Sequence, residues 1–562
     1  MSLSVLLCTG LQAGNSPGNI YKKGWIDFNK NGEKDVYEDP SAPLEARVAN
    51  LLSQMTLEEK TCQMATLYGS GRVLKDSLPT EAWSTEIWKD GIANIDEQAN
   101  GLGTFGSALS YPYVNSVRNR QAIQRWFVEN TRLGIPVDFT NEGIRGLCHD
   151  RATMFPAQCG QGATWDKELI SEIARVTAEE AIALGYTNIY SPILDIAQDP
   201  RWGRVVESYS EDPYLAGELG KRMIEGLQSR GLVSTPKHFA VYSVPVGGRD
   251  EGTRTDPHVA PREMRTLYLE TFRKAFCDAH AMGVMSSYND YDGVPITGSY
   301  HFLTEILRHE WGFRGYVVSD SEAVEFLYSK HKVAKDAVDA AAQVVNAGLD
   351  VRTNFSLPEN FIIPLRQAVA EGLVSMQTID SRVSDVLRVK FLMGLFDNPY
   401  KGDNRHPEKV VHSVEHQAVS LRAALESIVL LKNEGGFLPL SRSLAILLGG
   451  SLTLDDNPDD LNIFTLTLPV SAPITERTID ARQEMASYMI SEESDFAKPR
   501  SEVYTVLLVE DNADILSFMT EQLRKSFLVE TATNGMEALD VIRRAQIDII
   551  VTDIMMPVMD GL

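Results

Sequence analysis

The sequence predicts an α/β protein whose largest part, about residues 45–395, is a (β/α)8-type barrel. Two observations carry this prediction. Helix-length amphipathic stretches alternate with short, nearly continuous apolar runs, and strands of that composition are buried on both faces of a parallel sheet. Polar residues follow several of the apolar runs, at the strand ends where barrels of this type place their functional sites.

The clearest helix is predicted over residues 166–184. Asp166 is a typical helix-capping residue, Gly185 stands just past the end, and the apolar residues between them recur at three- and four-residue intervals. Seven strands are predicted in chain order: GLGTFG (101–106), IPVDFT (135–140), NIYSPIL (188–194), TPKHFA (235–240), GVMSSYN (283–289), YVVSD (316–320) and GLDVR (348–352). An eighth strand is not identified.

Composition narrows the classes of partner. The chain has 562 residues, 43% of them hydrophobic, and a formal net charge of -24. Its length and apolar content are typical of a globular protein with several domains. A surface this negative repels phosphate backbones, so nucleic acid is not expected as a partner. No run of about 18 apolar residues is present, so no membrane span is predicted.

The first 13 residues, MSLSVLLCTGLQA, form a short apolar run. The run resembles the apolar core and cleavage end of a secretory signal peptide, although the basic segment that normally precedes such a core is missing. We interpret residues 1–13 as a truncated signal peptide; the alternative is a frayed apolar arm. The first interpretation predicts a periplasmic or secreted protein.

Residues 27–38, DFNKNGEKDVYE, within the N-terminal segment 20–44, match the pattern of a calcium-binding loop. Calcium takes about six to eight oxygen ligands, and Gly32 allows the sharp turn that brings them together. No pair of helices flanks the loop, so a structural Ca²⁺ site is predicted; the alternative is a polar turn with solvated charges. The predicted ligands are the side chains of Asp27, Asn29, Asn31, Asp35 and Glu38 and the main-chain carbonyl of Glu33.

Polar side chains gather at the predicted strand ends. The residues in question lie within or shortly after predicted strands: Glu142, Lys237, His238, Tyr288 and Asp320. Carboxylates accept hydrogen bonds from hydroxyl groups, while cationic side chains donate to such groups and keep the carboxylates ionised. This combination suits a ligand with many hydroxyl groups. For any single residue, such as Asp320, the alternative is a helix-capping role.

Four sequence blocks resemble glycoside hydrolase family 3: PILDIAQDPRWGRVVESYSEDPYLAGE (192–218), PKHFA (236–240), VMSSYNDYDGVPITGS (284–299) and LTEILRHEWGFRGYVVSD (303–320). The resemblance covers about residues 45–447. It implies a retaining, exo-acting β-glucosidase or β-xylosidase that hydrolyses terminal β-D-glycosyl residues of oligosaccharides.

The resemblance implies that Asp320 is the catalytic nucleophile and that Arg204, Lys237, His238 and Tyr288 line the first sugar subsite. Lys237 and Arg204 are expected to lower the pKa of Asp320, and Tyr288 to donate to one of its oxygens. Taken alone, Arg204 could instead serve only as the partner of Glu207.

Two positions depart from the family pattern. Glu142 stands where the family commonly has an Asp that grips the C4 and C6 hydroxyls. The longer carboxylate leaves less room for an exocyclic CH₂OH group, which favours xylosides. Ser321 follows the nucleophile where many β-glucosidases have Trp, which removes an aromatic platform for the leaving sugar.

The general acid/base is not identified. In two-domain members of the family it comes from a second α/β domain; a linker and the start of such a domain are predicted over residues 396–447, where the resemblance stops. Impaired activity is therefore expected. The alternative donor is His258, oriented by Asp256, because TDPHVAP (255–261) is similar to the Asp-x-His loop of the N-acetylglucosaminidase branch.

Beyond residue 448 the sequence changes character. Residues 448–470 resemble the last hairpin of a histidine-kinase ATPase domain, residues 471–502 are linker-like, and residues 503–562 resemble part of a flavodoxin-like response-regulator receiver. The receiver resemblance implies that Glu510, Asp511 and Asp553 would bind Mg²⁺, with Asp553 as the phosphoacceptor. The alternative is an acidic cluster that takes no phosphate.

A receiver would work in the cytoplasm, whereas the glycosidase part is expected to be exported. We interpret the chain as a chimera that joins most of a family 3 glycosidase to the tail of a hybrid two-component sensor. The alternative function is that of a phosphorelay signalling protein.

Overall fold

The computed structural model divides into two compact units, Met1–Lys432 and Asn433–Leu562. In the first unit it describes residues 19–98, 107–243, 256–403 and 405–432. In the second it describes 451–455, 463–467 and 505–552, with gaps at 512–515, 518, 521–522, 525–526, 546 and 548.

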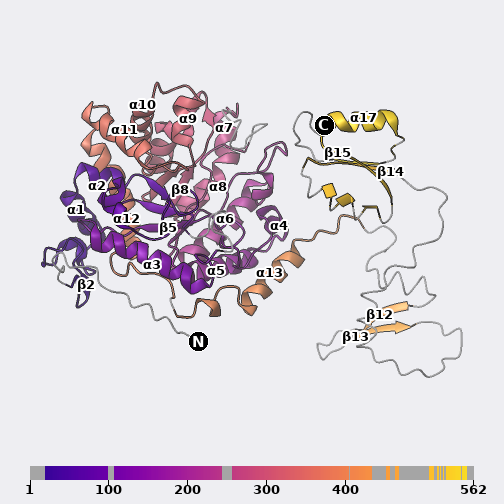
Figure 1. Ribbon diagram of the computed structural model, residues 1–562, viewed down its shortest axis with the longest axis horizontal. Coiled ribbons are helices and arrows are strands. Elements are labelled where there is room, and N and C mark those ends of the chain that lie inside the picture. Colours follow the sequence, from indigo (N-terminus) through magenta and orange to yellow (C-terminus); the bar gives the residue numbers. More distant parts are fainter. Residues whose placement is uncertain are drawn as a thin grey trace, which may run out of the picture. The chain divides into compact units, whose positions relative to one another are not determined.

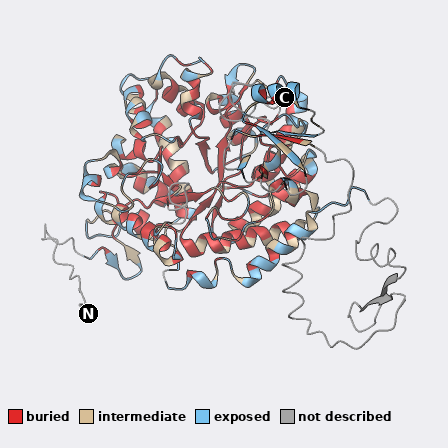
Figure 2. Cartoon of the chain, turned by 45° about the vertical axis from the view of Figure 1, so that its right-hand side comes forward, coloured by how far each residue is buried: buried red, intermediate tan, exposed pale blue. Residues whose placement is uncertain are grey.

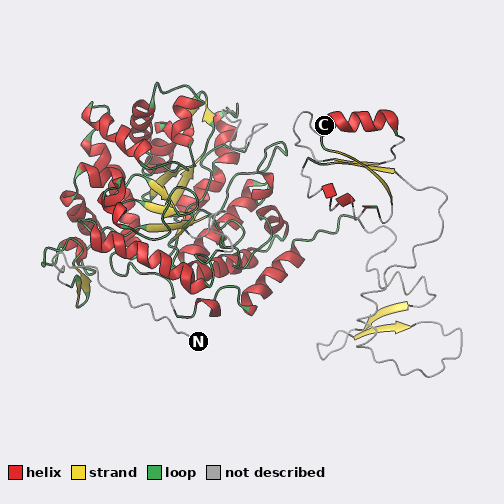
Figure 3. Ribbon diagram, in the orientation of Figure 1, coloured by secondary structure: helices red, strands yellow, loops and turns green. Residues whose placement is uncertain are grey.

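The first unit is a closed barrel of parallel strands inside a layer of helices (Figures 1 and 3). Five strands pair in the order β3 (Thr66–Tyr68), β4 (Asn94–Asp96), β5 (Asp138–Asn141), β6 (Asn188–Ile189) and β7 (Val233–Ser234). A parallel bridge from Phe239 reaches β8 (Gly283–Ser286), which pairs with β11 (Tyr316–Ser319). Bridges from Val318 to Val351 and from Arg352 back to Ala65 complete a ring of eight strands or bridged segments within the described residues.

The ring confirms the predicted barrel and adds two strands that the sequence analysis missed. β3 and β4 are three residues long and carry polar side chains at Thr66, Asn94 and Asp96, so they lack the apolar run used to recognise the others. The run predicted at 101–106 lies outside the described residues. The other six predicted runs all contribute to the ring.

The helices bury one face against the barrel and expose the other, as the red and blue ribbons of Figure 2 show. The predicted helix at 166–184 is confirmed as α5: the Asp166 side chain accepts a hydrogen bond from the Leu169 N–H at 3.0 Å, and Gly185 ends the helix with φ of 88°. The helices of this unit are α1 (Leu44–Gln54), α2 (Leu57–Cys62), α3 (Tyr113–Asn130), α4 (Gln158–Ala163), α5 (Lys167–Leu184), α6 (Pro213–Gln228), α7 (Pro261–Glu263), α8 (Glu270–Arg273), α9 (Ala323–Ser329), α10 (Ala337–Ala347), α11 (Glu359–Ala370), α12 (Met376–Leu392) and α13 (Val414–Glu426).

Shorter elements complete the unit. Two antiparallel strand pairs lie outside the barrel: β1 (Tyr21–Lys22) with β2 (Trp25–Ile26), and β9 (Asp290–Tyr291) with β10 (Val294–Pro295). Wider π-helical turns occur at Met264–Tyr268, Lys274–Asp278 and His301–Glu310.

Helix α13 (Val414–Glu426) packs against the barrel, although the sequence predicts a linker and the start of a second domain over residues 396–447. Helix α13 contacts α5, and the buried His416 ring places its Nδ1 2.8 Å from the Glu180 carboxylate. Arg422 donates to Asp166 at 2.7 Å and to Glu172 at 2.8 Å. This segment therefore belongs structurally to the barrel unit.

The described residues of the second unit form two small sheets. β12 (Ser451–Asp455) and β13 (Ile463–Thr467) pair antiparallel, as expected of a hairpin in 448–470, but the assignment of that hairpin to a kinase ATPase domain stays a prediction. β14 (Thr505–Val509) lies between β15 (Leu528–Ala532) and β16 (Ile549–Thr552) in a parallel sheet, and α17 (Gly535–Arg544) packs on it. Among the helices described in both units, none has the length and apolar character needed to cross a membrane.

Candidate active site

A cleft of about 720 Å³ opens at the carboxyl ends of the barrel strands. Because parallel strands all end at the same rim, residues far apart in the sequence meet there. The residues that follow or end successive strands and line the cleft include Tyr68, Glu97, Glu142, Arg204, Lys237, His238, Tyr288 and Asp320. All six site residues predicted for the sugar subsite and the nucleophile are among them.

Asp320 directly follows β11. One of its oxygens, Oδ1, accepts hydrogen bonds from the Tyr288 hydroxyl at 2.8 Å and from the Ser321 N–H at 2.7 Å. The other, Oδ2, lies 3.6 Å from Nε2 of His238 and has no hydrogen-bond partner within the described residues. The predicted donation from Tyr288 is therefore present, and it fixes the carboxylate with one oxygen left for another group.

Burial raises the pKa of Asp320 to about 6, while Arg204, Lys237 and the hydrogen bond from Tyr288 act in the opposite direction. The sequence analysis expected the two cations to lower this pKa. They do favour the ionised form, but the net direction is upward, because the carboxyl group is removed from water at the bottom of the cleft.

The His238 ring lies between two carboxylates. Its Nδ1 is 2.8 Å from Oδ2 of Asp195, which also accepts the His238 main-chain N–H at 3.0 Å. Burial, together with the charges of Arg204 and Lys237, lowers the pKa of His238 well below its ordinary value, so the imidazole is neutral. Asp195 directly follows a predicted strand, but nothing in the sequence pairs it with His238.

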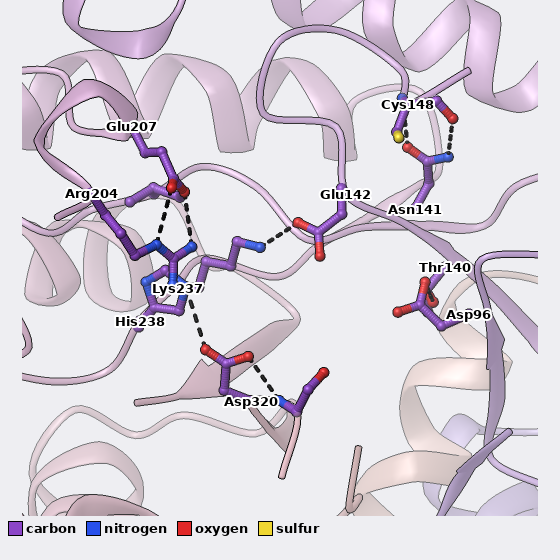
Figure 4. Close-up of polar contacts among 12 residues, drawn as sticks. Asp96, Thr140, Asn141, Glu142, Cys148, Arg204, Glu207, Lys237, His238 and Asp320 are labelled. Atoms are coloured by element: carbon purple, nitrogen blue, oxygen red, sulfur yellow. Dashed lines mark hydrogen bonds and ion pairs between the residues drawn. The ribbon is translucent and has the colours of Figure 1, made fainter. Parts of the chain in front are cut away.

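Two cation–carboxylate pairs flank this centre (Figure 4). The Lys237 ammonium contacts the Glu142 carboxylate across the cleft. Arg204 donates two hydrogen bonds to Glu207, at 3.1 and 2.8 Å, so the pairing considered for this arginine is present. Arg204 also lines the cleft and favours the charged form of Asp320, so the pairing with Glu207 does not remove it from the site.

Aromatic side chains that the sequence did not predict form part of the cleft wall. Phe326 packs on Tyr288 with ring centroids 5.5 Å apart, and Phe355 packs on Tyr68 at 4.8 Å. Phe355 is 45% exposed and so presents an apolar face to the cleft. The Ser321 hydroxyl lies 2.9 Å from that of Tyr68. No shared periodicity marks these residues, because they lie on separate strands and loops and, for Phe326, on helix α9.

The structure does not bring His258 into the cleft. Its side chain is 89% exposed, its Nδ1 is 3.6 Å from Asp256, and neither residue is part of the described cleft lining. Most other carboxylates of that lining are paired: Glu97 with Arg72, Glu142 with Lys237, Glu207 with Arg204 and Asp150 with His149. Glu322, two residues after Asp320, is exposed and forms no ion pair with the described residues.

The remaining predicted site residues lie elsewhere. The predicted calcium ligands occupy the single loop Asp27–Glu38 and none of them lines the cleft. In the receiver part, Glu510 and Asp511 directly follow β14, whereas Asp553 lies outside the described residues.

Comparison with known proteins agrees with this geometry. The model of the glycosyl hydrolase family 3 N terminal domain matches residues 56–389, and that of the response regulator receiver domain matches residues 506–562. A β-xylosidase of Formosa agariphila is 36% identical over 341 residues, which cover 57% of this chain and 46% of the relative. A periplasmic β-glucosidase of Salmonella typhimurium is 30% identical over 418 residues, or 73% and 50% of the two chains.

Among solved structures, a β-glucosidase from Erythrobacter marinus superimposes with a TM-score of 0.65 and 28% sequence identity, covering 88% of this chain and 59% of that one. The chain spans about half the length of the curated relatives it matches. The matched family domain extends over more than half of the 562 residues and contains every predicted residue of the cleft. The chain therefore belongs to glycosyl hydrolase family 3 and also carries a receiver-domain sequence at residues 506–562.

Proposed function

We propose that the protein is a retaining, exo-acting β-glycosidase that hydrolyses terminal β-D-glucosyl or β-D-xylosyl residues, with Asp320 as its nucleophile. The single observation that carries the proposal is the Asp320 carboxylate, which is fixed through Oδ1 and presents Oδ2 to a cleft lined by hydrogen-bonding groups. Family membership and relatives named β-xylosidase and β-glucosidase support it.

The chemistry follows a double displacement. Oδ2 of Asp320 attacks the anomeric carbon as the bond to the leaving oxygen breaks, which gives a glycosyl ester and releases the leaving group as its anion. Water then attacks the anomeric carbon, gives its proton to the solvent or to the departed anion, and restores the carboxylate. Tyr288 holds Oδ1 and so sets the direction from which Oδ2 attacks. Neutral His238 and cationic Lys237 and Arg204 provide donors for ring hydroxyls in the same cleft.

Glu142 and Lys237 are proposed to set the preference for the sugar. Their charged groups meet in the cleft, so a hydroxyl group bound there can donate to the carboxylate and accept from the ammonium. The length of the glutamate side chain reduces the space beside the ring and favours a pentose without the exocyclic CH₂OH group. We therefore propose xylosides as the better substrates.

A covalent trap tests the assignment of the nucleophile. A 2-deoxy-2-fluoro xyloside or glucoside with a dinitrophenolate leaving group should inactivate the protein and leave the sugar on Asp320. The fluorine slows both steps, but the good leaving group keeps the first step fast, so the glycosyl ester accumulates. Peptide mass spectrometry locates the label. A label on Glu322, or an unlabelled protein whose circular dichroism shows that it is folded, would refute the proposal.

The pH dependence of kcat/KM should have an acid limb near pH 6. Asp320 must be ionised to attack, and burial raises its pKa to about 6, so activity falls as the pH drops through that value. The variant Lys237→Gln removes a charge that favours the ionised form, so its limb should move to higher pH. Initial rates with an aryl glycoside between about pH 4 and 8 measure the acid limb of the unchanged protein and that of the variant. A limb near the ordinary pKa of an exposed Asp would contradict the role of burial.

We propose a periplasmic or secreted location, which the likeness to the periplasmic β-glucosidase supports.

The alternative function, that of a phosphorelay protein, has weaker support. The register of the parallel sheet pairs Val509 with Thr552, the residues that precede Glu510 and Asp553 in the sequence, but Asp553 itself lies outside the described residues.

A further inference from the structure

The loop Asp27–Glu38 connects β2 to a short 3₁₀ turn at Val36–Glu38 and is closed by its last residue. Glu38 is 1% exposed, and its carboxylate accepts hydrogen bonds from the main-chain N–H groups of Phe28 at 2.6 Å and Asp35 at 3.0 Å. Gly32 has φ of 84° and donates its N–H to Oδ2 of Asp27 at 3.1 Å. The first position of the loop is thus bonded to the sixth, and the last position to the second and the ninth.

The polar side chains at the third, fifth and ninth positions also converge. The amide groups of Asn29 and Asn31 both donate to Oδ2 of Asp35, at 2.7 and 2.9 Å. A half-turn of either amide about its last bond replaces the NH₂ group with the amide oxygen, which is the group that a cation would bind. Three side chains can therefore present oxygens to one point.

An independent observation at Asp27 points to a bound cation. The residue is 3% exposed, and its Oδ1 is buried without a hydrogen-bond partner among the described residues. Its Oδ2 is the oxygen that accepts from Gly32 and lies 4.0 Å from the Lys22 ammonium. A buried carboxylate oxygen without a partner destabilises the fold, whereas coordination of a metal ion would satisfy it.

We propose that this loop binds Ca²⁺, with ligands from Asp27, Asn29, Asn31, Asp35 and Glu38 and from the main-chain carbonyl of Glu33. Nowhere in the described part of the chain do three His, Cys, Asp or Glu side chains converge as a metal cluster. Of the six proposed ligands, Asp27, Asp35 and Glu38 are carboxylates and the other three are amide or carbonyl oxygens. To bind the ion, Asp35 and Glu38 must exchange the N–H bonds described above for contacts with the metal. Such a set suits Ca²⁺, which tolerates many oxygen ligands in irregular geometry, better than Mg²⁺.

The loop also packs against Phe396, which follows helix α12. Phe28, its second residue, is fully buried and packs edge-on against Phe396 with ring centroids 5.4 Å apart. Tyr37 contacts the same ring at 6.2 Å. Calcium would hold Phe28 and Tyr37 in this packing, so we expect the ion to stabilise the unit. The proposal is independent of the glycosidase assignment.

The test uses the full chain after treatment with EDTA. Calorimetric titration with CaCl₂ should show one binding site, and calcium at about a hundredfold excess over Kd should raise Tm by on the order of 3 °C. Asp27→Asn and Glu38→Gln should each weaken calcium binding by at least about tenfold, because each removes a charged ligand. Asn31→Ala should also weaken it, and this exposed position carries little risk to folding.

Glu33→Gln is the matched control, because it removes a charge from the same loop while the proposed ligand at that position is a main-chain carbonyl; it should bind calcium as the unchanged protein does. Equal affinities in the unchanged protein and all four variants would place the ion elsewhere and overturn the proposal. So would the lack of heat and of a Tm shift up to about 5 mM CaCl₂, or an equally strong response to MgCl₂.

Discussion

Replacing Asp320 with glycine is expected to lower kcat for an aryl β-glycoside by at least about 10⁴-fold, because removal of a nucleophile eliminates the covalent route. Sodium azide should restore turnover of the dinitrophenyl substrate in this variant. The small anion can occupy the space of the lost carboxylate and attack the anomeric carbon from the same side. The product should be a glycosyl azide of α configuration, which proton NMR identifies.

Asp138→Asn provides the control for removing a buried barrel carboxylate. Asp138 is 3% exposed, accepts hydrogen bonds from Thr187 at 2.5 Å and from Asn188 at 2.9 Å, and is not part of the described cleft lining. This variant should keep most of its turnover and gain nothing from azide. If Asp320→Gly retains turnover in the absence of azide, Asp320 is not the nucleophile.

The second large effect concerns the leaving group. The 562-residue chain should hydrolyse a dinitrophenyl β-xyloside far better than xylobiose. The ratio of the two kcat/KM values should exceed that of an enzyme with a positioned general acid by about 10²–10⁴-fold. The reason is that the cleft presents a nucleophile, while Glu97, Glu142 and Glu207 in its described lining are held in ion pairs. A leaving group of low pKa scarcely needs protonation. Comparison of kcat/KM for the two substrates gives the measurement.

Two variants show which group, if any, acts as the acid. Glu322→Gln tests the exposed carboxylate near Asp320, and His258→Ala tests the donor suggested by the sequence. Loss of disaccharide hydrolysis with retention of aryl glycoside hydrolysis would identify the residue responsible. If xylobiose is cleaved as readily as the aryl substrate and neither variant changes this, the expectation of a missing acid is wrong.

The sequence predicted the barrel because its central strands are apolar on both faces, and it predicted the position of Asp320 because a polar residue stands directly after such a strand. It could not predict β3 and β4. Each of these strands has only three residues and is held in the barrel by pairing with the strand or segment on either side of it. Pairing of this kind depends on residues far away in the chain and leaves no local pattern.

The site also contains residues that the sequence predicts and contacts that it does not. Residue types and family blocks pointed to Glu142, Arg204, Lys237, His238 and Tyr288, and the structure brings them into one cleft with Asp320. The sequence did not indicate the net direction of the Asp320 pKa, because desolvation depends on the depth of the finished cleft. The contacts of Asp195 with His238 and of Phe355 with Tyr68 were equally beyond reach, since each joins separate loops.

The closure of the barrel also fixes how long β3 waits, during synthesis of the chain, for the segment that completes the ring. The seam joins Ala65 to Arg352, and beside it the hydroxyls of Thr66 and Thr353 lie 3.1 Å apart although 287 positions separate them in the chain. At ribosomal speeds of about 5–20 residues per second, on the order of 15–60 s pass between the synthesis of the two edges. Throughout that interval the edge of β3 that faces away from β4 has no partner in the nascent chain, so a chaperone or a wrong partner can bind it first.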